Sequence, residues 1–217
     1  MKNPSYLVRK FDFLVIPAFF VFIATACYAQ ERNVPVEPSE ERLNRQHQPG
    51  VLIDAIGLKE GMVIADIGAG RGRLTVWFAT RVGNNGKVYA NDIDKEALDY
   101  LENRCRKNNF NNVETFLGRV DNPMLPPGTV DIAFMISTYH HLEKPVEMLR
   151  NTTACLKENG TLIIVERDPV KTGQTSREST SAETIERQAD EAGYYLLKTD
   201  RELLERDNVY FFKVKKE

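Results

Sequence analysis

The stretch VIADIGAGRGRLTVWFA, residues 63–79, contains an apolar strand, a glycine-rich turn and the start of a helix. Residues 62–66 predict a strand that ends in Asp66, and residues 74–82 predict a helix that stops at the turn GNNG. Glycines at positions 68, 70 and 72 lie between them. Because glycine has no Cβ, a ligand can approach the backbone here, and the helix start offers free N–H groups to an anion. The stretch therefore predicts a ligand site at the end of this strand.

The spacing of the turn and a second acid narrow the type of ligand. The glycines follow the pattern GxGxG, and Arg73 stands where the dinucleotide fingerprint GxGxxG requires a glycine. This argues against an NAD-binding oxidoreductase. The next predicted strand, residues 87–91, is followed by Asp92. Because ligands of doubly wound sheets bind beyond the carboxyl ends of the strands, the Asp92 carboxylate is placed to accept both hydroxyls of a ribose.

Strands and helices alternate along the rest of the chain. Further helices are predicted at residues 95–107, 146–156 and 182–192, and further strands at 113–117, 130–136 and 161–166. The last two strands, near residues 194–198 and 209–214, have no helix between them and should form an antiparallel hairpin at one edge. We therefore expect an α/β fold: a doubly wound, Rossmann-like, mostly parallel sheet of seven strands with an antiparallel C-terminal hairpin.

Composition excludes several classes of protein. The 217 residues suffice for one compact domain. The 29 Lys and Arg residues against 31 Asp and Glu residues give a net charge of -2, which disfavours a nucleic-acid partner. Three cysteines without a CxxC pair exclude a zinc ribbon and a fold built on disulfides, and no set of residues has the spacing of a metal site.

The N-terminal 29 residues differ from the rest of the chain. A basic start is followed by the uncharged residues 13–29, which end in small side chains, as in a secretory signal peptide. Cleavage after Ala29, lipidation at Cys27 and an uncleaved membrane anchor all remain open, although Pro17 would disturb a spanning helix. We expect the protein to be exported or membrane-anchored, with membrane contact through residues 13–29.

A short polar stretch separates this leader from the domain. Residues 30–39 contain two prolines and are expected to form a linker, so the domain is expected to comprise residues 40–217. Export would expose Cys105 and Cys155 to an oxidising compartment. They lie on predicted helices that pack on opposite faces of the sheet, so we expect no disulfide between them.

Four segments together resemble class I S-adenosylmethionine-dependent methyltransferases. Residues 63–79 followed by GKVYANDID (86–94) resemble motif I and the acidic motif of that family. GTVDIAFMISTYHHL (128–142) and LKENGTLIIVERDP (156–169) resemble its fourth and fifth strands, as in the small-molecule and lipid-like branches. The family fold is a seven-stranded sheet whose last strand is antiparallel, in agreement with the predicted hairpin.

The resemblance implies a set of residues that contact the cofactor S-adenosylmethionine. Asp66 and the glycine turn would frame its methionine end, Asp92 would hold the ribose hydroxyls, and Ile93 would pack near the adenine. Arg119 stands where the family usually has an acid, which leaves Asp121 as a candidate for the adenine contact. The complete cofactor set is Asp66, Gly68, Ala69, Gly70, Gly72, Asp92, Ile93, Val120 and Asp121. Arg71 and Arg73 are expected to be solvated residues at the helix start.

The residues that follow the fourth and fifth strands are candidates for the site that binds the methyl acceptor. Tyr139, His140 and His141 are candidates to face the reaction centre, with one histidine as a general base. The alternative, that one histidine caps or packs the next helix, remains open. Residues that follow the fifth strand, Glu166 and Asp168, are expected to line the acceptor pocket, and residues 167–181 to form a lid.

These features predict an enzyme that moves a methyl group from S-adenosylmethionine to a small-molecule or lipid-like acceptor. Much of the catalysis would come from holding donor and acceptor together. Two other functions remain as alternatives. One is a catalytically silent envelope protein that binds the cofactor, and the other is an NAD-binding oxidoreductase.

Overall fold

The computed structural model describes residues 34–173 and 179–216. The predicted leader, residues 1–29, lies outside the described residues, so its fate stays a prediction. Within the described part of the chain, no helix is both long and apolar enough to cross a bilayer.

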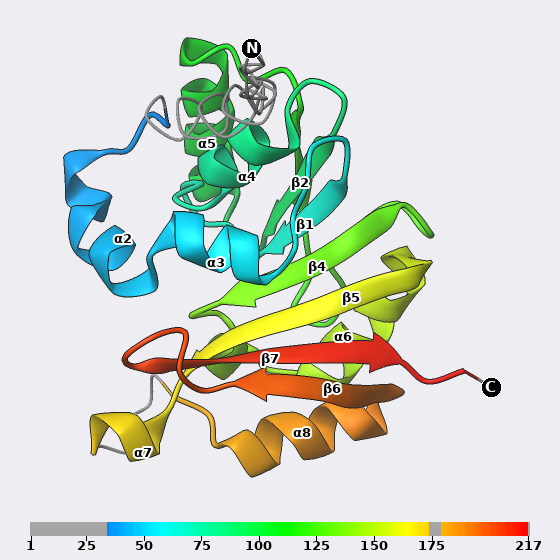
Figure 1. Cartoon of the computed structure of the whole chain (residues 1–217). Helices are drawn as coiled ribbons and strands as arrows, with labels where there is room; N and C mark the ends of the chain where they lie inside the picture. The colour runs from blue at the N-terminus through cyan, green and yellow to red at the C-terminus, as the bar shows by residue number, and fades with distance from the viewer. Residues whose placement is uncertain (1–33, 174–178, 217) are drawn as a thin grey trace, which may run out of the picture.

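A single mixed sheet forms the centre of the described residues (Figure 1). Five parallel strands come first in spatial order: β3 (Val113–Leu117), β2 (Lys87–Asp92), β1 (Val63–Ile67), β4 (Val130–Ile136) and β5 (Leu156–Arg167). Strand β7 (Asp207–Val214) pairs antiparallel with β5, and β6 (Tyr194–Asp200) pairs antiparallel with β7 at the edge. The predicted fold class is confirmed, including the C-terminal antiparallel pair.

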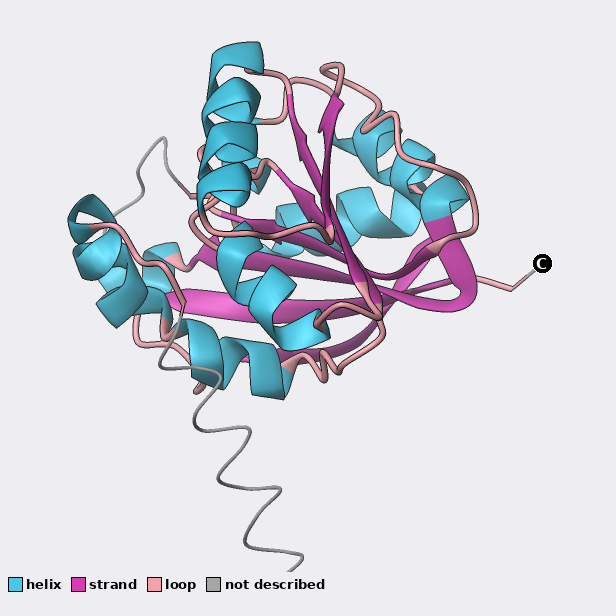
Figure 2. Cartoon of the chain, turned by 90° about the horizontal axis from the view of Figure 1, so that it is seen from above, coloured by secondary structure: helices cyan, strands magenta, loops and turns pink. Residues whose placement is uncertain are grey.

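Helices cover both faces of this sheet, as Figure 2 shows. On one face lie α3 (Pro49–Ala55), α4 (Thr75–Val82) and α5 (Lys95–Lys107); on the other lie α6 (Pro145–Cys155) and α8 (Ala182–Glu191). Cys105 packs in the first layer and Cys155 in the second, and both are free and buried. The two cysteines therefore lie on opposite faces of the sheet, as predicted.

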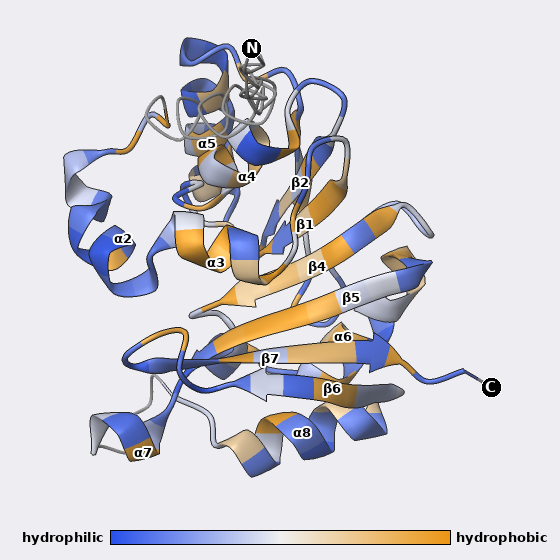
Figure 3. Ribbon diagram, viewed as in Figure 1, coloured by the Kyte–Doolittle hydropathy of each residue, from blue (hydrophilic) through white to orange (hydrophobic). Residues whose placement is uncertain are grey.

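The central strands are apolar on both faces because each face is covered by helices. In β4, Phe134 and Ile136 point toward α3 and α4, whereas Ala133 and Met135 point toward α6 and α8. The Phe78 ring of α4 meets the Phe134 ring edge to face, with centroids 5.0 Å apart. Figure 3 shows this apolar band running along β4 and β5.

The segment before the first strand packs closely against the domain. Arg104 on α5 binds both carboxylate oxygens of Glu40, at 2.7 and 2.9 Å, and the carbonyl of Pro35 at 2.8 Å. Part of the predicted linker, residues 34–39, therefore packs on α5. After the short η1 (Pro38–Glu40), helix α2 (Glu41–His47) ends at Gln48, whose φ of 43° turns the chain into α3.

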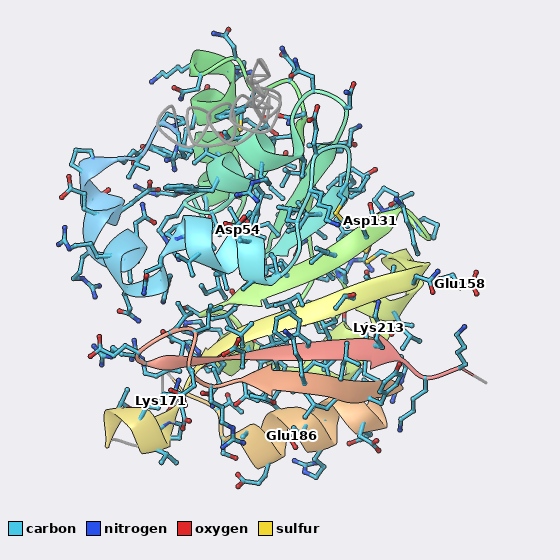
Figure 4. All side chains as sticks on the ribbon, in the orientation of Figure 1. Asp54, Asp131, Glu158, Lys171, Glu186 and Lys213 are labelled. Atoms are coloured by element: carbon cyan, nitrogen blue, oxygen red, sulfur yellow. The ribbon has the colours of Figure 1, made fainter. Side chains whose placement is uncertain are left out.

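Strand β5 is longer than predicted. It begins at Leu156 rather than at residue 161, and its register with β4 shifts between Val130 and Ile132. Asp131 holds this irregular start of β4, because it accepts the backbone N–H of Val63 at 2.8 Å and pairs with Lys157 at 2.7 Å. The side chain of Asp131 is labelled in Figure 4.

The predicted lid contains a short helix. Helix α7 (Pro169–Thr172) follows β5, and residues 174–178 lie outside the described residues. Lys171 donates hydrogen bonds to the carbonyls of Leu204 and Asp207, both at 2.9 Å, which fix α7 to the connection between β6 and β7 (Figure 4). Lid movement stays a prediction.

Candidate functional site

The glycine turn after β1 brings three segments of backbone close together. Gly68 has a φ of +79°, and a Cβ there would collide with the side chain of Thr138 at the end of β4. The N–H groups of Gly68 and Ala69 both donate to the Asn91 carbonyl at the end of β2, at 2.8 and 2.9 Å. A side chain at position 68 would therefore separate the ends of the strands.

Asp92 organises this turn and still has acceptor capacity. One carboxylate oxygen accepts the N–H of Gly70 at 2.7 Å, and the other accepts the N–H of Asp94 at 2.9 Å. An ionised carboxylate offers about four acceptor positions. Two therefore remain for hydroxyl groups of a ligand, which is compatible with the predicted ribose contact.

A first cavity of about 240 Å³ opens beside Asp92, and we call it the cofactor cavity. Four of the predicted cofactor residues line it: Gly68, Asp92, Ile93 and Val120. Ile93 is 60% exposed and presents an apolar surface to a ring. Asn91 also lines this cavity, although its sequence context did not predict a role. Its buried amide donates to the carbonyls of Phe116 and Pro123 and fixes the end of β3 and the chain after it against β2.

A second cavity of about 350 Å³ adjoins the first, and we call it the acceptor cavity. Both cavities are lined by Gly68, Ser137 and His141. Ser137 directly follows β4 and has a φ of 51°, a conformation that non-glycine residues rarely adopt. The two cavities therefore meet at the carboxyl ends of β1 and β4, where ligands of such sheets bind.

Asp66 lines the acceptor cavity. It is 2% exposed, and it accepts the hydroxyl of Thr75 at 2.6 Å. Burial raises the pKa of Asp66 to about 6, against the opposing effects of the Thr75 hydrogen bond and of Arg73. Its charge therefore responds to an incoming cation.

A buried histidine–carboxylate pair forms another wall of the acceptor cavity. Nδ1 of His140 lies 2.8 Å from Oε1 of Glu166, and the side chains are 7% and 0% exposed. The second oxygen of Glu166 has no hydrogen-bond partner among the described residues. Since the carboxylate only accepts, Nδ1 carries the proton and Nε2 of a neutral His140 is the basic nitrogen.

The wall contributed by α2 was not predicted. Arg73 donates to Asn44 at 3.0 Å and to Nδ1 of His47 at 2.9 Å, so the turn before α4 is fixed to α2. Burial and the neighbouring Arg73 lower the pKa of His47 to about 3, so it stays neutral. The expectation that Arg73 is a solvated residue is therefore wrong. In sequence, only Leu43 suggested that residues 41–47 pack inward.

Several predicted residues line neither cavity. Gly70 donates to Asp92, and Gly72, with a φ of +85°, touches α5, where a Cβ would collide with Leu101. Asp121 pairs instead with Lys144 at 3.2 Å, because the chain after β3 turns its carboxylate toward α6. This placement does not fit the predicted adenine contact of Asp121.

Tyr139 and Asp168 also lie elsewhere. Tyr139 is 2% exposed, packs in the core under α6 and α8, and donates to Gln188 at 2.9 Å. This burial does not fit the expectation that Tyr139 faces the reaction centre. Asp168 caps α7 and accepts from Asn208 at 2.8 Å, so its role is local. Within the described ranges, no group of three or more His, Cys, Asp or Glu side chains is placed to hold a metal ion.

Comparison with known proteins identifies the family. Residues 58–207 match the family model described as "Methyltransferase domain". The (S)-coclaurine N-methyltransferase of Thalictrum flavum subsp. glaucum is 23% identical over 153 residues, which cover 70% of this chain and 40% of that protein. The ubiquinone/menaquinone biosynthesis C-methyltransferase UbiE of Escherichia fergusonii is 28% identical over 115 residues, which cover 52% of this chain and 46% of that protein. The chain thus spans less than half the length of these curated relatives.

A solved structure matches nearly the whole fold. The crystal structure of a SAM-dependent methyltransferase from Aquifex aeolicus has a TM-score of 0.74 and 25% identity, and the match covers 87% of this chain and 98% of the other. Its fold, the family match and the two cavities at the strand ends agree with one another. The chain therefore belongs to the methyltransferase-domain family, as one of the class I S-adenosylmethionine-dependent methyltransferases.

Proposed function

We propose that this protein transfers a methyl group from S-adenosylmethionine to a small-molecule acceptor held in the acceptor cavity. The observation that carries the proposal is the shared wall of the two cavities at Gly68, Ser137 and His141. The cofactor cavity presents the Asp92 carboxylate, which can accept ribose hydroxyls. The acceptor cavity presents the His140–Glu166 pair. The printed names of the two curated relatives, which refer to coclaurine and to ubiquinone and menaquinone biosynthesis, support a small acceptor.

The residues of the cofactor cavity fit S-adenosylmethionine. Asp92 has acceptor positions left for the ribose hydroxyls, and Ile93 offers an apolar surface for the adenine. Asp66 lines the adjoining acceptor cavity rather than the cofactor cavity, so the methionine end of the cofactor would extend into the acceptor cavity. An ammonium group beside Asp66 would favour its ionised form. When bound, this cofactor supplies a methyl group attached to a positively charged sulfur. After transfer of the methyl group, the leaving group is the neutral thioether S-adenosylhomocysteine.

The chain's own contribution to the reaction is positioning and, where the acceptor must lose a proton, base catalysis. The adjoining cavities hold the two reactants in contact, which replaces an encounter in solution. His140 accepts the acceptor's proton at Nε2, while Glu166 keeps the proton on Nδ1 and stabilises the resulting imidazolium. In this mechanism Glu166 is a positioning residue.

Calorimetry and product detection test the proposal together. The purified protein is titrated with S-adenosylmethionine and with NAD, and is then incubated with a panel of small-molecule acceptors while S-adenosylhomocysteine is measured by mass spectrometry. We expect S-adenosylmethionine to bind and NAD not to bind. Tighter binding of NAD would overturn the proposal. Cofactor binding without product from any acceptor would favour the silent cofactor-binding protein.

We also propose that residues 1–29 direct the domain to the membrane or across it. The order of basic, apolar and small residues supports this proposal. The short apolar stretch fits a cleaved signal peptide as well as a retained anchor. The mass of the mature protein distinguishes these outcomes.

A further inference from the structure

His47 lies between a cation and a carboxylate beside the acceptor cavity. Its Nδ1 is 2.9 Å from the Arg73 guanidinium, and its Nε2 is 3.6 Å from Oδ2 of Asp207. The His47 and Asp207 side chains are 1% and 3% exposed. The three residues come from the end of α2, from the turn before α4 and from the start of β7. They form a row of contacts across three elements, which we call the Arg73–His47–Asp207 row.

The partners of His47 determine which of its nitrogens carries the proton. A guanidinium only donates, so Nδ1 accepts from Arg73 and the proton of the neutral ring is on Nε2, where the Asp207 carboxylate faces it. The side-chain amide nitrogen of Gln46 lies 3.2 Å from both Nε2 and Oδ2, and it donates to the carboxylate oxygen. Asp207 therefore favours the tautomer and the ring orientation that Arg73 requires.

The sheet holds Asp207 in place. Asp207 is the first residue of β7 and pairs with Arg167 at the end of β5 in the antiparallel ladder. Its carbonyl also accepts a hydrogen bond from Lys171 of α7 at 2.9 Å. Because the backbone of Asp207 is fixed by these contacts, its carboxylate is a fixed point that orients His47 and, through His47, Arg73.

Arg73 connects this row to the methionine end of the cofactor. It lines the acceptor cavity together with Asp66, and its positive charge opposes the burial that raises the pKa of Asp66. The ammonium and carboxylate groups of an amino acid are attached to the same carbon, so a carboxylate and a guanidinium on one cavity match them. Among the described residues Arg73 donates to Asn44 and His47, so three of its five N–H groups remain for a ligand.

We propose that His47 and Asp207 are positioning residues for the cofactor: they hold the Arg73 guanidinium where it binds the carboxylate of the methionine end. The proposal rests on the proposed function and adds to its site two residues that act through Arg73. A freely rotating arginine loses rotamer freedom when it binds a ligand, whereas an arginine held by the row has already lost it. The row therefore raises the affinity for the amino-acid end of the cofactor and leaves the binding of adenosine unchanged.

Two ligands that differ only at the amino-acid end separate this role from a purely structural one. S-adenosylhomocysteine carries the amino acid, and methylthioadenosine has a methyl group in its place on the same sulfur. Calorimetry measures both affinities for each protein, and their ratio reports the contribution of the amino-acid end. We expect the wild-type protein to bind S-adenosylhomocysteine more tightly by about 10-fold or more.

Asp207→Asn keeps the shape of the side chain and removes its charge. Loss of a negative charge near Arg73 would by itself strengthen the binding of a carboxylate, whereas loss of the orienting contact weakens it. We expect Asp207→Asn to lower the affinity for S-adenosylhomocysteine by about 3- to 10-fold and to leave the affinity for methylthioadenosine unchanged.

Two replacements of His47 provide a second test, which decides the result if Asp207→Asn does not fold. His47→Leu removes the acceptor for Arg73 and should lower the affinity for S-adenosylhomocysteine by about 5- to 30-fold. His47→Asn retains an oxygen that can accept from Arg73 and should restore part of this loss. Asp131→Asn is the matched control, because Asp131 supports the sheet near the amino end of β4 and lines neither cavity.

The outcomes separate this proposal from the proposed function. An unchanged affinity ratio in the Asp207 and His47 variants, an equal loss for both ligands, or tighter binding of S-adenosylhomocysteine to Asp207→Asn would each overturn the proposal. If the wild-type protein binds S-adenosylmethionine and the ratio does not change, only the positioning role is wrong. If the wild-type protein binds neither S-adenosylmethionine nor S-adenosylhomocysteine, the proposed function fails and the positioning role fails with it.

Discussion

Asp92 uses one carboxylate both to order the glycine turn and to contact the proposed ribose. Replacing it by alanine removes the hydrogen bond from Gly70 and the expected pair of ribose contacts. We expect a loss of about 2–3 kcal/mol, or about 30- to 150-fold, in affinity for S-adenosylmethionine, measured by calorimetry. Asp121→Ala is the control, because Asp121 pairs with Lys144 and lines neither cavity. Equal effects of the two replacements would contradict the assignment of Asp92.

Asp66 should make the stability of the protein depend on pH. Its pKa is about 6 in the folded state, above the ordinary value of 3.8. Between about pH 4 and pH 6 the folded state keeps a proton that the unfolded state has released, so the free energy of unfolding falls as pH rises. Asp66→Asn cannot ionise and can still accept the Thr75 hydroxyl.

The difference between these two proteins isolates the contribution of Asp66. Near pH 4 their unfolding free energies should be similar, and near pH 7 the Asn variant should be more stable by up to about 3 kcal/mol. Urea denaturation at both pH values measures this difference. A constant difference between the two pH values would show that Asp66 does not titrate as described.

The buried pair of His140 and Glu166 predicts a division of roles between neighbouring histidines. If His140 is the base, His140→Gln should lower the rate of S-adenosylhomocysteine formation by about 10²–10⁴-fold and spare cofactor affinity. His141→Gln should have a smaller effect, because His141 is exposed and has no carboxylate partner among the described residues. Glu166→Gln should change the pH profile of the rate. A lower melting temperature with unchanged turnover would assign His140 a purely structural role.

At the scale of elements, one buried ion pair fixes the N-terminal segment that builds the acceptor cavity. Arg104 and Glu40 are 4% and 9% exposed, and α2, which carries Arg42 and His47, follows Glu40 directly. Glu40→Ala removes the carboxylate that binds Arg104 most closely and leaves the buried guanidinium with only the more distant Glu37, at 3.8 Å. We expect a loss of up to about 3 kcal/mol in the free energy of unfolding, measured by denaturant titration, because Glu37 still compensates part of the charge.

An exposed ion pair provides the comparison for this prediction. Lys87 and Glu114 pair at 3.2 Å, with side chains 44% and 51% exposed. Glu114→Ala should therefore cost no more than about 1 kcal/mol. Equal losses in Glu40→Ala and Glu114→Ala would show that the N-terminal segment is not fixed by Arg104.

The sequence predicted well those elements whose pattern depends only on residues close together in the chain. Residues 63–92 carry a buried strand, a glycine turn, a helix and a second strand whose order depends only on neighbouring residues, and the structure places Asp66, Gly68 and Asp92 at the strand ends as expected. Tyr139 and His140 show that local signals do not predict where a side chain points. They are adjacent in the η2 turn (Tyr139–His141), yet Tyr139 enters the core and His140 meets Glu166.

Residues brought together over long distances were not predictable from local patterns. Arg42 and His47 reach the acceptor cavity because the left-handed Gln48 turns α2 back over the site. No periodicity in residues 41–47 specifies that direction. Arg73 looked like a solvated helix-start residue for the same reason, since its partners Asn44 and His47 lie on another element.

At the scale of the whole molecule, the domain and its leader point to different cellular compartments. The domain tolerates an oxidising compartment, because Cys105 and Cys155 are buried on opposite sheet faces and cannot pair with each other. Its proposed cofactor is a cytoplasmic metabolite, which favours an anchored domain on the cytoplasmic side. The leader sequence allows cleavage, lipidation or retention.

Intact-mass analysis of soluble and membrane fractions decides among these fates. Cleavage after Ala29 gives a soluble chain that begins at Gln30, and lipidation gives a membrane-bound chain that begins at Cys27. Retention gives a membrane-bound chain that still contains Lys2. We expect one of these three products, because an uncharged stretch as apolar as residues 13–29 is not left in water. A full-length chain found only in the soluble fraction would contradict both export and anchoring, and would leave the cofactor freely available to the domain.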